Sequence, residues 1–192
     1  VIKKDGSSET SPNRIEDLKF PIIAKSHMGS RGVGNTKLDT QEQLEAWMVG
    51  KTLSNYIFEE YISNMTREYR LHITSEGCFY ACRKLLKNDS PEGTWQLHDD
   101  VVSWAVESNP SFKKPLNWNL IVEDCIKAKD ALGLDICAFD VMVQGSKKSV
   151  ERTNPEWAII ESCSAPSFGD ITLEKYLLEI PKVLKRKFIN QI

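Results

Sequence analysis

The sequence lacks a hydrophobic run long enough to cross a bilayer as a helix, which excludes a helical membrane span. It also lacks an excess of either charge, because 25 Lys and Arg residues against 27 Asp and Glu residues leave a formal net charge of −2. A chain without net positive charge has little attraction for nucleic acid or for an anionic membrane surface. We therefore expect neither as a partner.

The sequence also lacks the cysteine and histidine spacings that are typical of disulfide frameworks and zinc sites. The five cysteines are odd in number and scattered, mostly inside apolar runs, so they indicate reduced thiols in a cytoplasmic protein and not a disulfide framework. His27, His72 and His98 lie far apart and do not have the spacing of a zinc site. At 192 residues, 41% of them hydrophobic, the chain can form one domain or two small lobes around a cleft.

An apolar run over residues 20–24 ends in a lone lysine, Lys25, and a glycine-rich turn follows over residues 29–34. Glycines in such a turn can take positive φ and present bare backbone N–H groups, which form a concavity that suits phosphate oxygens. A lysine at the end of the strand adds a point charge for the same phosphates. An ordinary strand and turn with a surface lysine explains this segment equally well. The candidate phosphate-binding residues are Lys25, Gly29, Ser30, Gly32 and Gly34.

Hydrophobic periodicity predicts the other elements. Thr40 and Gln43 form a capping box that begins a helix, Gly133 is placed to end another, and Pro181 is expected to kink or break a third. The predicted helices are 40–53, 119–132 and 173–188. The predicted strands are 56–62, 67–74, 78–86, 136–143 and 157–163, with a long loop over 88–118 that contains one short strand near 95–102.

Asp140 and Glu161 are carboxylates inside strongly apolar predicted strands. An unpaired buried carboxylate is costly, so each needs a cation or a hydrogen-bond donor. For either acid alone, a salt bridge to Arg or Lys is the simpler explanation. Two acids on paired strands, in a chain with a phosphate-type loop, favour a Mg²⁺ ion held between carboxylates and nucleotide phosphates. Strict alternation places Trp157, Ile159, Glu161 and Cys163 on one face of their strand.

The order of these motifs is informative as a set. After the lysine and glycine loop come FEEYI at 58–62, REYR at 67–70, LGLDICAFD at 132–140 and IESCSAP at 160–166. This series, over residues 20–180, resembles the ATP-grasp superfamily. It is most similar to the branch that holds the ribosomal-protein glutamate ligases and, more distantly, D-alanine–D-alanine ligase.

The resemblance implies an α+β ATP-grasp fold of two lobes, each with an antiparallel sheet and helices, and an ATP cleft between them. It divides the chain into a tail or linker (1–14), a small lobe (15–62) and a large lobe (63–192). It further implies an ATP- and Mg²⁺-dependent ligase that joins a small-molecule or peptide carboxylate to an amine through an acylphosphate. The N-terminal lobe that precedes these two in the family is missing here, so we expect a further segment or a partner chain to supply it.

Residue roles follow from the resemblance. Lys25 and the glycine loop would contact the phosphates or adenine, and Glu68 would bind the ribose hydroxyls. Asp140 and Glu161 would hold Mg²⁺. The adenine-binding hinge would be formed by Glu59, Glu60, Tyr61 and Ile62. The catalytic cations would be Arg83 (or Lys84) and Arg70. The alternatives are a solvated charged face for the glutamates, ion pairs with strand acids for the arginines, and local packing for Trp95, Trp104 and Trp118.

The sequence departs from the family pattern after the second metal-binding acid, where Cys163 stands at the position of an expected asparagine. Cysteine is a soft ligand and suits Mg²⁺ poorly. The arginine and asparagine expected after Arg83 are not evident, and His98 is the candidate replacement. An alternative function is therefore an ATP-binding module, or a degenerate ATP-grasp domain with little catalysis, within a larger protein. A third alternative is a structural or interaction domain that binds no nucleotide.

Overall fold

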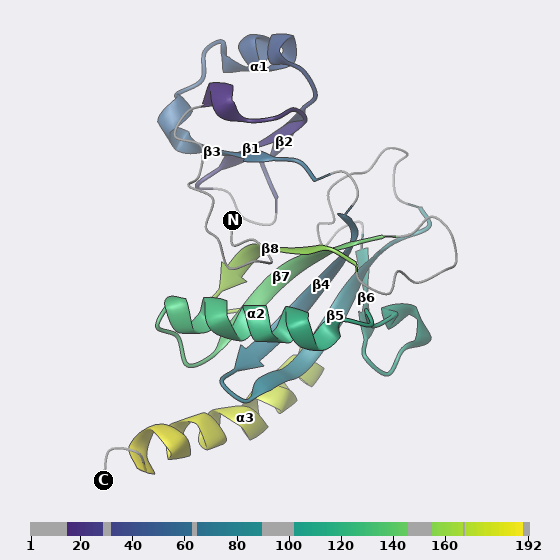
Figure 1. Ribbon diagram of the computed structural model, residues 1–192, viewed down its shortest axis with the longest axis vertical. Coiled ribbons are helices and arrows are strands. Elements are labelled where there is room, and N and C mark those ends of the chain that lie inside the picture. The colour runs from purple at the N-terminus through teal and green to yellow at the C-terminus, as the bar shows by residue number, and fades with distance from the viewer. Residues whose placement is uncertain are drawn as a thin grey trace. The chain divides into compact units, whose positions relative to one another are not determined.

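The computed structural model describes residues 15–28, 32–62, 65–89, 102–145, 155–166 and 168–189 (Figure 1). The chain divides into two compact units, Val1–Ser63 and Asn64–Ile192. Each unit is built on one antiparallel sheet with helices packed against it, so the expected α+β class is confirmed. Among the described residues, no helix is both long enough and apolar enough to span a membrane.

The first unit holds a three-stranded sheet in the order β2-β1-β3. Its strands are β1 (Ile22–Ser26), β2 (Thr36–Leu38) and β3 (Tyr56–Glu60). Its helices are α1 (Gln41–Met48) and two short 3₁₀ helices, Ile15–Asp17 and Leu53–Asn55. Ile22, Ala24, Leu38 and Leu44 form its small buried core, and Trp47 and Phe58 pack against them.

Helix α1 begins at the predicted capping box. The Thr40 hydroxyl oxygen accepts a hydrogen bond from the Gln43 N–H at 3.3 Å, while the Gln43 side chain accepts one from the Asp39 N–H at 2.7 Å. The helix ends at Met48, five residues before the predicted end, because the next two residues leave the helical conformation. Val49 has φ −56° and ψ 120°, and Gly50 has φ 73°.

The second unit holds a five-stranded sheet in the order β6-β5-β4-β7-β8. The strands are β4 (Met65–Thr74), β5 (Gly77–Leu86), β6 (Val102–Val106), β7 (Cys137–Gln144) and β8 (Trp157–Cys163). The helices are α2 (Trp118–Ala131), α3 (Asp170–Ile189) and a 3₁₀ helix, Pro110–Phe112. The predicted strand near 95–102 lies outside the described residues except for Val102, where β6 begins. Part of the predicted long loop is therefore strand and 3₁₀ helix.

The main core lies between α2 and one face of this sheet (Figure 1). Alternate residues of β4 point into it: Tyr69, Leu71 and Ile73 are fully buried. From α2, Ile121 and Cys125 meet them at helical spacing. Each large apolar side chain buried in this way contributes about 1.5–3 kcal/mol to the free energy of unfolding. This packed layer supports the sheet, whose opposite face carries the polar residues described below.

Helix α3 packs on that opposite face. Tyr176 is buried against His72, with 2.9 Å between its hydroxyl oxygen and the imidazole Nδ1. The helix runs without interruption through Pro181, so the predicted break is wrong. The helix is anchored on both sides of the proline, by Tyr176 before it and by the ion pair of Arg186 with Glu76 after it. These contacts offset the loss of one helical hydrogen bond.

Candidate functional site

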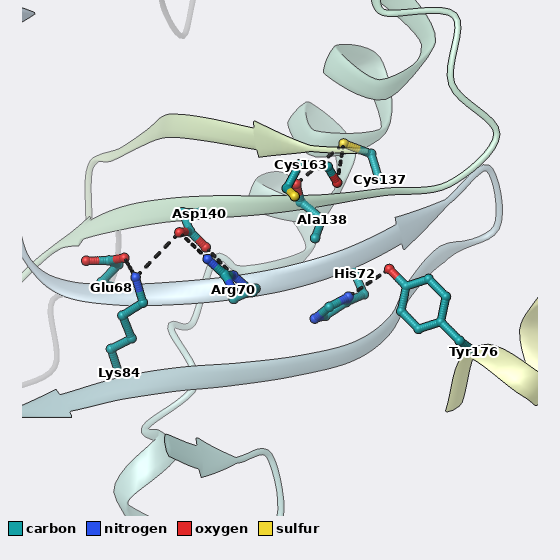
Figure 2. A network of polar contacts seen from close by, with 9 residues as sticks. All are labelled: Glu68, Arg70, His72, Lys84, Cys137, Ala138, Asp140, Cys163 and Tyr176. Carbon is teal, nitrogen blue, oxygen red and sulfur yellow. Dashed lines mark hydrogen bonds and ion pairs between the residues drawn. The ribbon is translucent and has the colours of Figure 1, made fainter. Parts of the chain in front are cut away.

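Three charged residues lie in a row across neighbouring strands of the second unit. Arg70 on β4 is directly opposite Asp140 on β7, and Asp140 is directly opposite Glu161 on β8. Opposed residues of antiparallel strands project from the same face of the sheet. The row therefore lies on the face away from α2. Figure 2 shows Arg70 and Asp140 meeting across their two strands.

A β-bulge in β8 brings Glu161 to this face. Val141 pairs with Ile159 and Asp140 pairs with Glu161, so Ile160 is an extra residue without a partner on β7. Trp157 and Ile159, before the bulge, pack against the core on the α2 side. The prediction that Trp157, Ile159, Glu161 and Cys163 share one face is therefore wrong, because the bulge reverses the alternation between Ile159 and Glu161.

Asp140 is held by two cations. Its Oδ1 accepts a hydrogen bond from Arg70 Nε and its Oδ2 accepts one from Arg70 Nη2, both at 2.7 Å. Lys84 Nζ lies 3.5 Å from Oδ2. Burial opposes ionisation of this carboxyl, which is only 5% exposed. The hydrogen bonds from Arg70 and the charges of Lys84 and Arg70 outweigh burial and lower the pKa of Asp140, so it is a carboxylate at neutral pH.

Lys84 also forms an ion pair with Glu68, which Figure 2 shows beside Asp140. Glu68 is buried, and burial raises its pKa even though the charge of Lys84 acts in the other direction. Burial would lower the pKa of Lys84, but the charges of Glu68 and Asp140 outweigh it and raise that pKa. One ammonium group thus stands between two carboxylates that come from different strands.

Trp104 on β6 completes this surface. It pairs with Lys84 in the sheet register, and its ring lies 5.5 Å from both Lys84 Nζ and the Arg70 guanidinium carbon. The indole is 40% exposed. An exposed aromatic ring beside two cations can stabilise their charge and can also stack on a planar ligand. From the sequence alone, Trp104 is expected to contribute only local packing, because no motif identifies it as a site residue.

Arg83 does not join the charged row. It pairs with Tyr69 in the register and therefore points to the α2 face, where its Nη1 donates to the Ser111 carbonyl oxygen at 3.0 Å. Burial lowers the pKa of Arg83. Neighbouring residues of a strand face opposite ways, so of the two candidate cations Arg83 and Lys84 only Lys84 lies beside Asp140.

The candidate residues of the first unit lie on or beside β1 and β3. Lys25 Nζ forms an ion pair with Glu59 Oε2 at 2.5 Å. Glu60 Oε1 accepts a hydrogen bond from the Lys19 N–H at 3.0 Å. The Tyr61 N–H donates to the Pro21 carbonyl oxygen at 2.8 Å, and Ile62 is exposed. In the glycine turn, Gly32 and Gly34 have φ of 76° and 84°, as the prediction requires, while Gly29 and Ser30 lie outside the described residues.

The candidate donors for a metal ion, Asp140 and Glu161, are two carboxylates and do not form a closed set of ligands. Within the described residues no group of three or more His, Cys, Asp and Glu side chains could hold a metal ion. Asp140 and Glu161 share a face, and each oxygen can accept more than one interaction. Two hard carboxylates suit Mg²⁺ when phosphates and water supply the other ligands. Cys163 is half-buried opposite Ala138 on the same face, and its thiol does not suit this ion. His98 lies outside the described residues.

Comparison with known proteins finds similarity at the level of structure only. No protein-family model matches the sequence, and no curated protein matches it. D-alanine–D-alanine ligase from Bacillus anthracis, in its complex with ATP, is similar with a TM-score of 0.58 and 14% identity over 95% of this chain and 59% of the ligase chain. A second structure of that ligase gives 0.57 and 14% over 92% and 54%.

The purK enzyme N5-carboxyaminoimidazole ribonucleotide synthetase, in its ADP complex, is similar with a TM-score of 0.51 and 16% identity over 80% of this chain. This chain spans 37% of the length of that enzyme chain. It spans less than two thirds of the chain in each of the three similar structures. The chain therefore has the ATP-grasp fold, which confirms the fold expected from the sequence motifs.

Proposed function

We propose that this chain carries the nucleotide and metal site of an ATP- and Mg²⁺-dependent carboxylate–amine ligase. The row of Arg70, Asp140 and Glu161, with Lys84 beside it, carries the proposal. It places hard oxygen donors and two cations on one face of a rigid sheet. The shared fold with a ligase solved in complex with ATP supports this assignment, although fold alone does not define an activity.

Asp140 and Glu161 would hold Mg²⁺, which when bound neutralises phosphate charge and orients the transferred group. Lys84 and Arg70 lie beside Asp140 and would contact phosphate oxygens. Half-buried cations that are held in place before the substrate arrives need little reorganisation, so they are effective at stabilising developing negative charge. Glu68, which Lys84 already engages, would accept hydrogen bonds from the ribose hydroxyls.

We also propose nucleotide contacts for residues of the first unit, considered by itself. Lys25 and the amides of the glycine turn, including those of Gly32 and Gly34, would bind phosphate oxygens. The adenine contacts would come from Glu59, Glu60, Tyr61 and Ile62. The Tyr61 N–H already donates to Pro21, so adenine recognition at this residue would rely on its carbonyl oxygen and its ring.

The proposed reaction transfers the γ-phosphoryl group of ATP to a carboxylate oxygen, which releases ADP and gives an acylphosphate. An amine then attacks the acyl carbon, and phosphate leaves as the C–N bond forms. The acid would be a small molecule or a peptide. The five free cysteines fit a reducing compartment such as the cytoplasm.

The test is release of ADP and phosphate by the purified chain. The proposal expects release that requires an acid, an amine and Mg²⁺ together, measured over a panel of carboxylates and amines. ATP binding without turnover in every combination would contradict the ligase assignment.

A second candidate is a nucleotide-binding module with little catalysis, and Cys163 favours it because a thiol replaces the expected amide beside Glu161. Under this view Cys163→Asn strengthens Mg²⁺-dependent ATP binding, which calorimetry would measure; unchanged affinity would contradict it. A thermal-shift series with ATP and Mg²⁺ separates both candidates from a domain that binds no nucleotide, because a ligand of the folded state raises the midpoint.

A further inference from the structure

Helix α3 uses only one side to pack on the sheet. Tyr176 and Glu179 are buried there, Arg186 forms an ion pair with Glu76, and Val183 is half-buried between them. These residues recur at the three- and four-residue spacing of one helix face. The helix is shown at the yellow end of the chain in Figure 1. Its remaining surface is open to solvent among the described residues.

A second face of α3 is apolar and exposed. Its five members are each between 41% and 64% exposed: Leu173, Leu177, Ile180, Leu184 and Phe188. They are separated by four, three, four and four residues, so they form a continuous stripe along about four turns of helix. We call this set the α3 stripe. An apolar surface of this length on one helix marks an interaction site.

The segments outside the described residues contain no apolar run longer than two residues. The longest of them, residues 1–14, is apolar only at Val1, Ile2 and Pro12. A matching surface must present apolar residues at helical spacing over a similar length, and α3 itself has that property.

The charges along α3 favour an antiparallel partner of the same sequence. Beside the α3 stripe, on the flank away from the sheet, lie Glu174 near the start of the helix and Lys185 near its end. Two copies placed antiparallel about a two-fold axis at Ile180 bring Glu174 of each copy next to Lys185 of the other. A parallel two-fold arrangement would instead place this flank of each copy beside the sheet-facing side of the other, so Glu174 and Lys185 would not pair.

The same two-fold axis aligns the apolar residues. With Ile180 on the axis, Leu177 faces Leu184 of the second copy and Leu173 faces Phe188, so every member of the stripe has an apolar partner. One register thus satisfies both the apolar and the charged positions. The interface is isologous, as a closed dimer requires. The sheet-facing side of α3 points about 120° away from the stripe, since each residue turns the helix by about 100°.

We propose that the α3 stripe is a dimer interface, in which α3 pairs with α3 of a second copy in antiparallel orientation. This inference does not depend on the proposed ligase activity. It identifies the occupant as a second copy of this chain, and it makes Ile180 the residue that meets its own counterpart.

Sedimentation velocity of the 192-residue chain over a concentration series tests the proposal. We expect a species of twice the 21.8 kDa chain mass in the wild type and a monomer in Leu177→Asp. The matched control is Leu178→Asp, because Leu178 is as exposed as Leu177 (66% against 64%) but lies off the stripe. It should remain dimeric. A monomeric wild type, or the same effect from both variants, would overturn the proposal.

Charge exchange and crosslinking test the orientation. Glu174→Lys and Lys185→Glu should each weaken the dimer, and the double variant should restore it. Ile180→Cys should form an intermolecular disulfide under mild oxidation beyond the background of the wild-type cysteines, whereas Leu178→Cys should not. A double variant weaker than both single variants, or equal crosslinking at the two positions, would overturn the antiparallel arrangement.

Discussion

Arg70 holds both carboxylate oxygens of Asp140, with Nε and Nη2 each 2.7 Å from its acceptor. Paired N–H donors of this kind form the strongest class of protein ion pair and also define its orientation. Asp140 is therefore both aligned and charged before any ligand binds. The stability of a fold with a buried, ionised carboxylate depends on the cation that pairs with it, and this contribution can be measured.

Arg70→Met should destabilise the second unit by about 3 kcal/mol, because Asp140 remains buried with Lys84 as its only close cation. Asp140→Asn added to the same variant should recover part of the loss by removing the uncompensated charge. Urea unfolding of the wild type, the single variant and the double variant measures both effects. A single variant within about 0.5 kcal/mol of the wild type would show that Arg70 does not hold Asp140 in solution.

Lys84 and Arg83 are neighbours in sequence but face opposite sides of the sheet. Lys84→Met should raise the Kd for ATP with Mg²⁺ at least about tenfold, a loss of about 1.4 kcal/mol, because one of the proposed phosphate cations is removed. Arg83→Met is the matched control: it should lower stability through the lost bond to Ser111 and leave the Kd unchanged. Calorimetric titration with ATP and Mg²⁺ separates the two effects. A larger loss of affinity in Arg83→Met would contradict the assignment.

His72 should make the docking of α3 sensitive to acid. Burial, with a contribution from the charge of Arg70, lowers the pKa of His72 from 6.5 to about 4. The unfolded chain therefore binds the proton more readily than the folded chain, so stability is full above pH 6.5 and falls as the pH drops toward 4. The expected loss between pH 7.5 and pH 5 is about 2 kcal/mol.

Denaturant unfolding at the two pH values measures this loss, and His72→Gln provides the control. The variant cannot take up the proton, so its stability should change less over the same interval. An identical pH dependence in the wild type and the variant would show that the proton binds elsewhere.

Much of the framework could be predicted from the sequence, because it depends on local patterns. The strand predicted over 67–74 lies within β4, and the capping box located the start of α1. The predicted end of α1 at residue 53 was wrong, because Val49 and Gly50 leave the helical conformation directly after Met48. The continuity of α3 through Pro181 depends on tertiary contacts that no local pattern records.

The candidate site was predictable in its residue types and less so in its geometry. Asp140 and Glu161 stood out because acids are rare in apolar strands. Their common face depends on the bulge at Ile160, which no residue type signals. The choice between Arg83 and Lys84 required the register of β5, and Trp104 became a candidate only when β6 was placed beside Lys84.

The most direct test of the central claim is a crystal structure of the chain with a non-hydrolysable ATP analogue and Mn²⁺, with the metal located by its anomalous signal. The account predicts Mn²⁺ bound by Asp140 and Glu161, and phosphate oxygens in contact with Lys84 and Arg70. A nucleotide bound away from these four residues, or a metal that contacts neither carboxylate, would contradict it.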